Sequence, residues 1–220
     1  MDLIDHICLE ITCPFCIGCH SFIKHKYLFC QSCYDRLIAD RSRLIQLNQF
    51  KQFPVYSFIE WKRFESDMLS ELVYHLKRFS SQKIWQDLTK EVLKELEPHL
   101  SKNKQLIFIP VPGHSASYHT HFFAKSLAEQ MSGQVLLNAL IHFNGEQQKQ
   151  LNRKQRFNIC LSWNEDFTQR VPKGAVVIIV DDIITTGATM QAASSIVHKQ
   201  LVQLGNRSCT IVGLSLFYRT

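Results

Sequence analysis

The chain has 220 residues, of which 45% are hydrophobic and 20% are charged, and its formal net charge is +6. These values are ordinary for a globular protein with one full core and a small added module, and the moderate positive charge is compatible with an anionic partner without establishing one. No apolar run approaches membrane-spanning length, and the start, MDLIDHICLEITC, lacks the basic and apolar regions of a secretory signal. We therefore expect a cytoplasmic protein.

The segment 13–33, CPFCIGCHSFIKHKYLFCQSC, contains two C-x2-C pairs in a stretch too short for a hydrophobic core. Cytoplasmic thiols stay reduced, so clustered cysteines favour a metal over disulfides. Each pair places two sulfurs on one side of a tight turn, and two pairs complete a tetrahedral Zn²⁺ site. We predict a zinc-ribbon module whose structural zinc is bound by Cys13, Cys16, Cys30 and Cys33.

The same segment leaves alternatives open. Cys19 also forms a C-x2-C pair with Cys16, so Cys19, His20 or His25 could replace one ligand. A redox dithiol or free buried cysteines are the other interpretations. If zinc has four protein ligands, no coordination position remains open, and the metal folds the module without catalysing a reaction.

The next segments predict a connection and two helices. Residues 34–47, YDRLIADRSRLIQL, predict a helix that leads out of the ribbon, and residues 48–61 predict a link with short strands. We place the ribbon and its connecting helix at residues 1–50 and a second domain at residues 51–220. Helical apolar spacing then covers residues 64–79 and 81–96, with Lys77 as an exposed cation on the first helix.

An alternation of strands and helices begins at residue 106. Residues 106–112, LIFIPVP, predict a buried strand that enters a rigid loop, because the prolines fix the backbone before Gly113. Residues 115–131 predict a helix and residues 134–143 a strand. This order predicts an α/β fold with an open parallel sheet.

Residues 144–158, NGEQQKQLNRKQRFN, interrupt the apolar pattern between strands. A polar and basic insert of this length in a compact fold predicts a flexible functional loop. Lys149 and Arg153 are the cations that we expect to act there.

Residues 176–189, VVIIVDDIITTGAT, carry the most specific chemistry of the chain. The run Val176–Val180 suits a strand covered on both faces, and Asp181 and Asp182 would lie at its carboxyl end, where open α/β sheets bind ligands. A tight loop follows, and then a helix over residues 188–204 that stops at Gly205.

This arrangement predicts a phosphate site beside a sugar site. The helix N-terminus, preceded by threonine hydroxyls and a glycine, makes a phosphate cradle. Adjacent carboxylates would repel phosphate, so we expect them to accept hydrogen bonds from vicinal sugar hydroxyls, with Mg²⁺ near the phosphates offsetting the charge. A Walker B strand is disfavoured because no GxxxxGK[ST] occurs in the chain. A buried strand with a capping aspartate is the simpler alternative.

The stretch 181–189 resembles the phosphoribosyl pyrophosphate (PRPP) signature of type I phosphoribosyltransferases. The resemblance implies that family's open parallel sheet, and Mg²⁺ bound with PRPP. It implies that Asp181 and Asp182 form the catalytic centre and hold the ribose 2′- and 3′-hydroxyls. The residues implied to hold the 5′-phosphate are Thr185, Thr186, Gly187, Ala188 and Thr189.

The same resemblance implies two further contacts with PRPP. The loop after the strand at residue 106 would bind pyrophosphate through Val111, Pro112 and Gly113, next to His114. The insert at residues 144–158 would close over PRPP as a hood, bringing Lys149 and Arg153 toward the departing pyrophosphate.

The order of these parts is similar to that of the competence protein F (ComF) family of bacterial phosphoribosyltransferase-like proteins. It comprises the cysteine ribbon, LVYHLKRF at residues 72–79, the Pro-Val-Pro loop, the PRPP signature, and an element formed by Gln148, Leu151, Arg156 and Asn158. Many members carry Arg-Gly-Phe-Asn-Gln after the Pro-Val-Pro loop, whereas this chain has HTHFFAKSLAE there. The difference affects the expected acceptor and pyrophosphate contacts.

Membership would imply binding of single-stranded DNA during natural transformation. It would also imply a location peripheral to the inner membrane, without a transmembrane segment, and contact with other DNA-uptake proteins. Tyr27, Phe29 and Trp61 are candidate aromatic side chains for stacking with the bases of the unpaired strand. An ordinary salvage or biosynthetic phosphoribosyltransferase is the second hypothesis, and a PRPP-sensing regulator without catalysis is the third.

Overall fold

A six-stranded sheet organises the chain in the computed structural model, which describes residues 15–23, 28–62, 67–78, 82–100, 104–113, 119–142 and 161–220. The strand order is β1-β2-β8-β7-β3-β4. The strands are β1 (Ser42–Gln46), β2 (Val55–Trp61), β3 (Leu106–Pro110), β4 (Gln134–Val135), β7 (Val176–Ile184) and β8 (Thr210–Arg219). Only the edge pair β1–β2 is antiparallel among these neighbours. The predicted open, mostly parallel sheet is confirmed.

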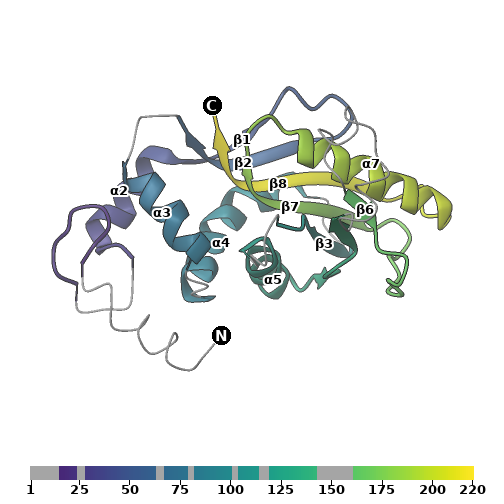
Figure 1. The fold of residues 1–220 in the computed structure, drawn as a ribbon, viewed down its shortest axis with the longest axis horizontal. Helices are drawn as coiled ribbons and strands as arrows, with labels where there is room; N and C mark the ends of the chain where they lie inside the picture. Colours follow the sequence, from purple (N-terminus) through teal and green to yellow (C-terminus); the bar gives the residue numbers. More distant parts are fainter. Residues whose placement is uncertain are drawn as a thin grey trace.

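Helices cover both faces of this sheet (Figure 1). Helices α4 and α5 lie on one side and α7 on the other. The helices are α2 (Gln31–Arg41), α3 (Asp67–Arg78), α4 (Gln82–Leu96), α5 (His119–Met131) and α7 (Ala188–Gln203), with a short 3₁₀ helix, η1 (Glu97–His99). A separate hairpin-like sheet pairs β5 (Leu140–His142) with β6 (Leu161–Trp163). Within the described ranges, no helix is long and apolar enough to cross a membrane.

The apolar run of β7 divides between two cores. Val176, Ile178 and Val180 pack in the core on the α4 and α5 side, whereas Val177 and Ile179 pack in the core on the α7 side. Side chains of a strand alternate between faces, so a strand buried on both sides contains no polar alternation. The prediction of a fully buried strand at residues 176–180 is confirmed.

The predicted helix at residues 34–47 is too long. Helix α2 ends at Arg41, and residues 42–46 form β1, which pairs with β2 at the sheet edge. The apolar residues after Arg41 fit either helix or strand, and pairing with β2 decides between them because it supplies partners for the backbone groups.

The single strand predicted at residues 134–143 is two short strands. Between β4 and β5 the backbone turns at Asn138, whose φ is +62°. Asn adopts this left-handed conformation more readily than most residues, and the turn sends β5 to pair with β6 instead of extending β4.

The cysteine-rich segment packs directly against the rest of the protein. Cys16, Cys33 and Leu37 belong to the same buried cluster as Leu72 of α3. The hydroxyl of Tyr34 on α2 donates to a backbone carbonyl of α4 at 3.4 Å. β1, within the predicted first module, is part of the main sheet. The division at residue 50 stays a prediction.

Candidate functional site

Strand β7 continues beyond Val180 and carries both aspartates within its last residues. Its pairing with β8 extends to Ile184 opposite Tyr218, so the strand is longer than predicted. The reason is that β8 also runs on, to Arg219, and supplies backbone partners for residues 181–184. Asp181 and Asp182 are therefore held by the sheet and not by a loop.

The two carboxylates are oriented by backbone amides. Oδ1 of Asp181 accepts the N–H of Asp182 at 2.9 Å, and Oδ1 of Asp182 accepts the N–H of Ile183 at 2.9 Å. Asp181 is only 8% exposed, and burial, followed by the negative charge of Asp182, raises the pKa of Asp181 well above its usual range. A buried carboxylate of this kind is costly unless hydrogen-bond donors satisfy it, and vicinal sugar hydroxyls are such donors.

A lysine from α3 balances part of this negative charge. Nζ of Lys77 lies 3.7 Å from Oδ2 of Asp182, and the Lys77 side chain is about half exposed. The sequence indicated Lys77 as an exposed cation, but its partner is 105 positions away in the sequence. Only the packing of α3 beside β7 brings them together.

The loop after β7 leaves the start of α7 open. Helix α7 begins after Gly187, whose φ is +79° and which, as the N-cap residue, has no side chain to cap the helix. Thr185 and Thr186 are exposed, and Oγ1 of Thr186 accepts the N–H of Ala188 at 3.4 Å. The first N–H groups of a helix have no partner within it, so this end fits an oxyanion such as phosphate.

Gly187 has a left-handed backbone conformation and is also closely packed against its neighbours. A Cβ at this position would overlap the ring of Phe50, from the loop between β1 and β2. The same loop is tied to α7 because Nε2 of Gln191 donates to Oε1 of Gln52 at 3.0 Å. The β1–β2 loop therefore forms one wall beside the predicted phosphate cradle.

Gly187→Ala should destabilise the protein by about 1–3 kcal/mol and weaken PRPP binding, because the new methyl adds left-handed strain and displaces Phe50. Gly174→Ala is the matched control, since Gly174 also has a positive φ, +73°, but nothing lies within 4 Å of its Cβ position. Chemical unfolding and calorimetric titration with Mg²⁺-PRPP give the two readouts. Equal unfolding costs for both variants, with PRPP affinity retained in Gly187→Ala, would contradict this packing argument.

In the loop after β3, only one of the three residues predicted to bind pyrophosphate can offer it a backbone N–H. The N–H of Val111 donates to the carbonyl of Val180 at 2.8 Å, and the carbonyl of Val111 accepts the Thr120 hydroxyl at 2.7 Å. The Val111 side chain is buried, and Pro112 has no N–H. Gly113 therefore carries any amide contact that this trio makes with pyrophosphate. His114, Lys149 and Arg153 lie outside the described residues.

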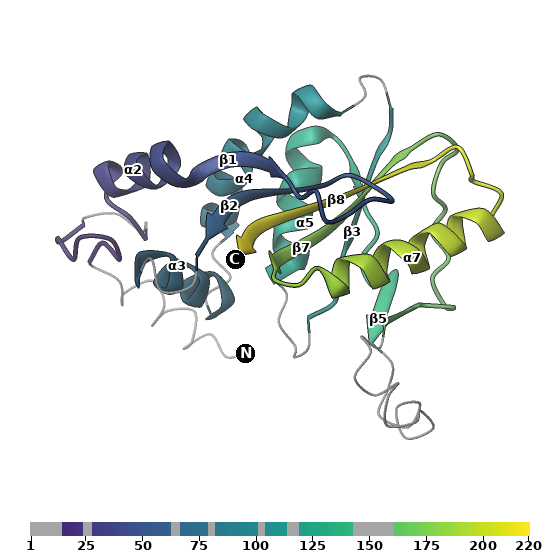
Figure 2. The same cartoon turned by 90° about the horizontal axis from the view of Figure 1, so that it is seen from above.

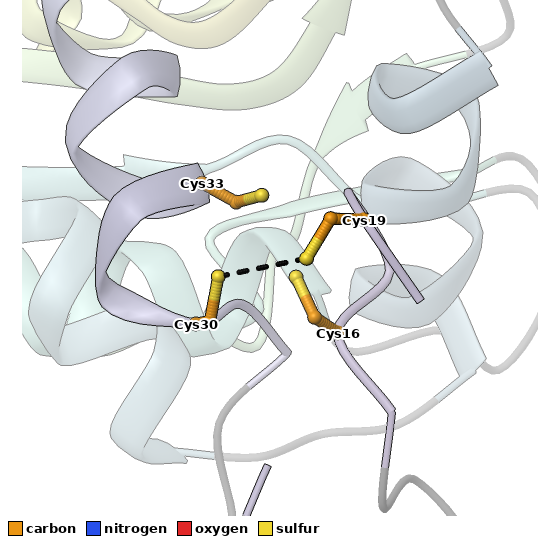
Figure 3. Close-up of side chains that lie close together, drawn as sticks. All are labelled: Cys16, Cys19, Cys30 and Cys33. Carbon is orange, nitrogen blue, oxygen red and sulfur yellow. Dashed lines mark hydrogen bonds between the residues drawn. The ribbon is translucent and has the colours of Figure 1, made fainter. Parts of the chain in front are cut away.

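The four cysteines at positions 16, 19, 30 and 33 converge (Figure 3). Their Sγ atoms all lie within 4.8 Å of one another, and those of Cys19 and Cys30 are 3.7 Å apart. Tetrahedral zinc with Zn–S bonds of about 2.3 Å places its sulfurs about 3.8 Å apart. The cluster therefore fits a structural zinc ion.

Cys19 enters the cluster through a tight turn. The N–H of Cys16 donates to the carbonyl of Ser21 at 2.9 Å, and the N–H of His20 donates to the carbonyl of Cys16 at 2.8 Å. This turn faces Cys30 and Cys33 at the start of α2. The cluster contains three of the four predicted ligands, together with a residue foreseen as a substitute, while Cys13 and His25 lie outside the described ranges.

The sequence missed one residue at this edge of the sheet. Arg219 ends β8 next to Trp61, which ends β2, and its guanidinium carbon lies 4.9 Å from the centroid of the indole ring. The available signal was the strand-like run TIVGLSLFYR, which ends on a cation. The pairing of β8 with β2 and β7 places Arg219 beside Trp61.

Comparison with known proteins gives structural similarity alone. No family model matches the chain, and no curated protein does. It is similar to a crystal structure of adenine phosphoribosyltransferase, with 17% identity, a TM-score of 0.41, and coverage of 80% of this chain and 84% of the other. The Saccharomyces cerevisiae adenine phosphoribosyltransferase has 18% identity and a TM-score of 0.39, with coverage of 80% of this chain and 83% of the other. A Staphylococcus aureus hypoxanthine phosphoribosyltransferase has 15% identity and a TM-score of 0.39, with coverage of 64% of this chain and 68% of the other. These low scores assign no activity to the chain.

Proposed function

We propose that this protein binds PRPP at the carboxyl end of β7 and handles single-stranded DNA during bacterial natural transformation. The observation that carries the PRPP part is the buried Asp181 and its neighbour Asp182, followed through a short loop by the start of α7, whose N-cap residue is Gly187. Carboxylates for ribose hydroxyls and free N–H groups for phosphate then lie a few residues apart. The DNA part rests on the resemblance to the ComF family and on the exposed aromatics of the cysteine module.

Different residues of the proposed site bind different parts of PRPP. Asp181 and Asp182 hold the ribose hydroxyls, residues 185–189 hold the 5′-phosphate, and Gly113 approaches pyrophosphate. Mg²⁺ binds oxygen ligands and would arrive with the PRPP phosphates, whose negative charge it offsets. Lys77 limits the repulsion between that charge and the carboxylate of Asp182.

We also propose that Cys16, Cys19, Cys30 and Cys33 hold a structural zinc ion. Such a site supplies the folding energy that a segment this short lacks, and four thiolates leave no open position for chemistry. The zinc would fix the turn at residues 16–19 against the start of α2.

Two aromatic side chains on this module are suitable for stacking with unpaired bases. Phe15 and Phe22 are 52% and 67% exposed, and their ring centroids are 6.1 Å apart in an edge-to-face arrangement. Base–aromatic stacking needs exposed rings. Of the three aromatics considered from the sequence, Phe29 is buried and cannot stack, Tyr27 lies outside the described ranges, and Trp61 is half-buried.

The test is fluorescence anisotropy of a labelled single-stranded oligonucleotide titrated with zinc-loaded protein at several salt concentrations, with and without Mg²⁺-PRPP. We expect affinity that falls with salt, and about a fivefold or greater loss in Phe22→Ala, as stacking contributes about 1–3 kcal/mol per base. Tyr74→Ala is the control, because Tyr74 is 49% exposed on α3. No binding at low salt would reject the DNA role and leave the PRPP site to be tested separately.

A small-molecule phosphoribosyltransferase is the second candidate function. It is favoured by a pocket of about 300 Å³ beside Asp182, where an acceptor could meet the ribose. In the transfer, a nucleophilic nitrogen bonds to ribose C1′ as the bond from C1′ to the pyrophosphate oxygen breaks, and pyrophosphate leaves with the electron pair. Release of pyrophosphate that depends on one added acceptor would identify this activity.

A further inference from the structure

The pocket beside Asp182 lies where three parallel strands end. β2 and β8 contribute Trp61 and Arg219 and β7 contributes Asp182 and Ile183, while α3 forms the side with Val73 and Lys77. Figure 2 shows the carboxyl end of β8 next to β2 and α3. Its volume of about 300 Å³ is at the lower end of the range for small-ligand sites, and the carboxyl edge of a parallel sheet is where such ligands bind.

The lining combines flat apolar surface with cationic groups. Trp61 supplies an aromatic ring, and Val73 and Ile183 supply aliphatic surface. Aromatic rings pack in offset or edge-to-face arrangements, so this surface favours a planar occupant over a bulky or flexible one.

The charges of the lining residues leave one cation without a carboxylate. Lys77 lies 3.7 Å from Asp182, so these two largely balance each other. Arg219 is exposed at the rim and lies over the Trp61 ring, and Asp182 is the only carboxylate among the pocket residues in the described part of the chain. A guanidinium group binds a carboxylate through two parallel hydrogen bonds, a geometry that lysine cannot provide.

We propose that this pocket binds a planar, singly anionic aromatic compound about the size of a nucleobase. Its carboxylate would pair with Arg219 and its ring would pack along Trp61, with the opposite ring edge toward Asp182. This inference rests on the proposed PRPP site, since the occupant would then lie beside the ribose, in the position of an acceptor.

The charge count distinguishes this class from two others. A neutral base would leave Arg219 without an anionic partner in the pocket as the described residues form it. A group with several negative charges would approach the Asp182 carboxylate, whose attraction to Lys77 offers little surplus positive charge. A single carboxylate at the Arg219 end avoids both costs.

The experiment uses matched probes that differ in the anionic group. Zinc-loaded full-length protein is titrated calorimetrically with orotate against uracil, and with nicotinate against nicotinamide, with and without Mg²⁺-PRPP. At least one anion should bind about tenfold or more tightly than its neutral partner, because hydrogen bonds to charged groups contribute about 1.5–3 kcal/mol. Arg219→Gln should remove that preference, and Trp61→Ala should weaken both members of the pair.

Arg207→Gln is the control for the arginine substitution. Arg207 is exposed before the start of β8, whereas Arg219 ends the same strand, so the control makes the same change at the opposite edge of the sheet. Circular dichroism and the melting temperature establish that Arg219→Gln is folded, and Arg219→Lys, which keeps the charge, should retain part of the preference.

Equal affinity for anionic and neutral probes, an unaltered preference in Arg219→Gln, or no saturable binding of either anion would overturn the inference. PRPP titration of the same protein separates the two proposals. PRPP binding without anion binding rejects this pocket assignment alone. Anion binding that depends on Arg219, without PRPP binding, rejects the proposed PRPP site and with it the acceptor role, while the pocket remains.

Discussion

Asp181→Asn combined with Asp182→Asn should abolish measurable PRPP binding while the cysteine module stays folded. Each carboxylate accepts hydrogen bonds from ribose hydroxyls in the proposed complex, and hydrogen bonds to charged groups contribute about 1.5–3 kcal/mol each. Losing both lowers the affinity about a hundredfold or more. Calorimetric titration with Mg²⁺-PRPP measures this loss, and zinc content measures the integrity of the module.

The buried carboxylate of Asp181, which we expect to bind the ribose, should lower the stability of the folded protein. Asp181 is buried and its pKa is raised, so the folded state holds its proton more tightly than the unfolded state, where the pKa is about 3.9. Stability therefore falls as pH rises from about 3.9 toward the raised folded value. Asparagine does not ionise and can still accept the N–H of Asp182 through its side-chain oxygen.

Asp181→Asn alone should therefore raise the melting temperature, and the gain should be larger at pH 7 than at pH 4. Thermal unfolding followed by circular dichroism at the two pH values gives the result. Asp166→Asn is the control, because Asp166 is exposed in a turn after β6. Unchanged PRPP affinity in the double variant would defeat the assignment of the ribose site, whatever the stability shows.

Cys33→Ser should remove zinc and unfold the front of the protein. The Sγ of Cys33 lies in the four-sulfur cluster, and the residue is buried in the core that α3 also enters. Structural zinc in small modules binds with an apparent free energy of about 10–16 kcal/mol, so loss of one thiolate should reduce the bound zinc from about one ion per chain to nearly none. Elemental analysis after dialysis measures the metal, and limited proteolysis locates the unfolded segment.

Two comparisons sharpen the zinc result. Cys209→Ser should retain zinc, since Cys209 lies near Pro172, far from the cluster, with its Sγ 3.3 Å from the Pro172 carbonyl. Cys19→Ser should lose zinc and Cys13→Ser should retain it, if the four clustered sulfurs are the ligands. The reverse result would restore Cys13 to the ligand set. A full complement of zinc in Cys33→Ser would reject the site.

Local patterns in the sequence were sufficient for the central elements. The apolar run at residues 176–180 predicts a strand covered on both faces, and the glycine after two threonines predicts the loop before α7, because both depend on residues close together in the chain. The paired C-x2-C motifs likewise predict a sulfur cluster. The ends of elements depend on tertiary partners, as α2 shows, because a helix and a strand can share one apolar pattern until a partner strand is present.

The sequence by itself determined the chemistry at the end of β7: two carboxylates, a small-residue loop and a following helix. Tertiary structure alone decided what surrounds them. It placed Lys77 against Asp182, Phe50 against Gly187 and Arg219 beside Trp61, and it brought Cys19 into the sulfur cluster. Most of these contacts join residues far apart in the chain. Cys19 becomes part of a sulfur cluster because its turn lies next to Cys30 and Cys33 at the start of α2. They depend on strand order and helix packing, which no local pattern specifies.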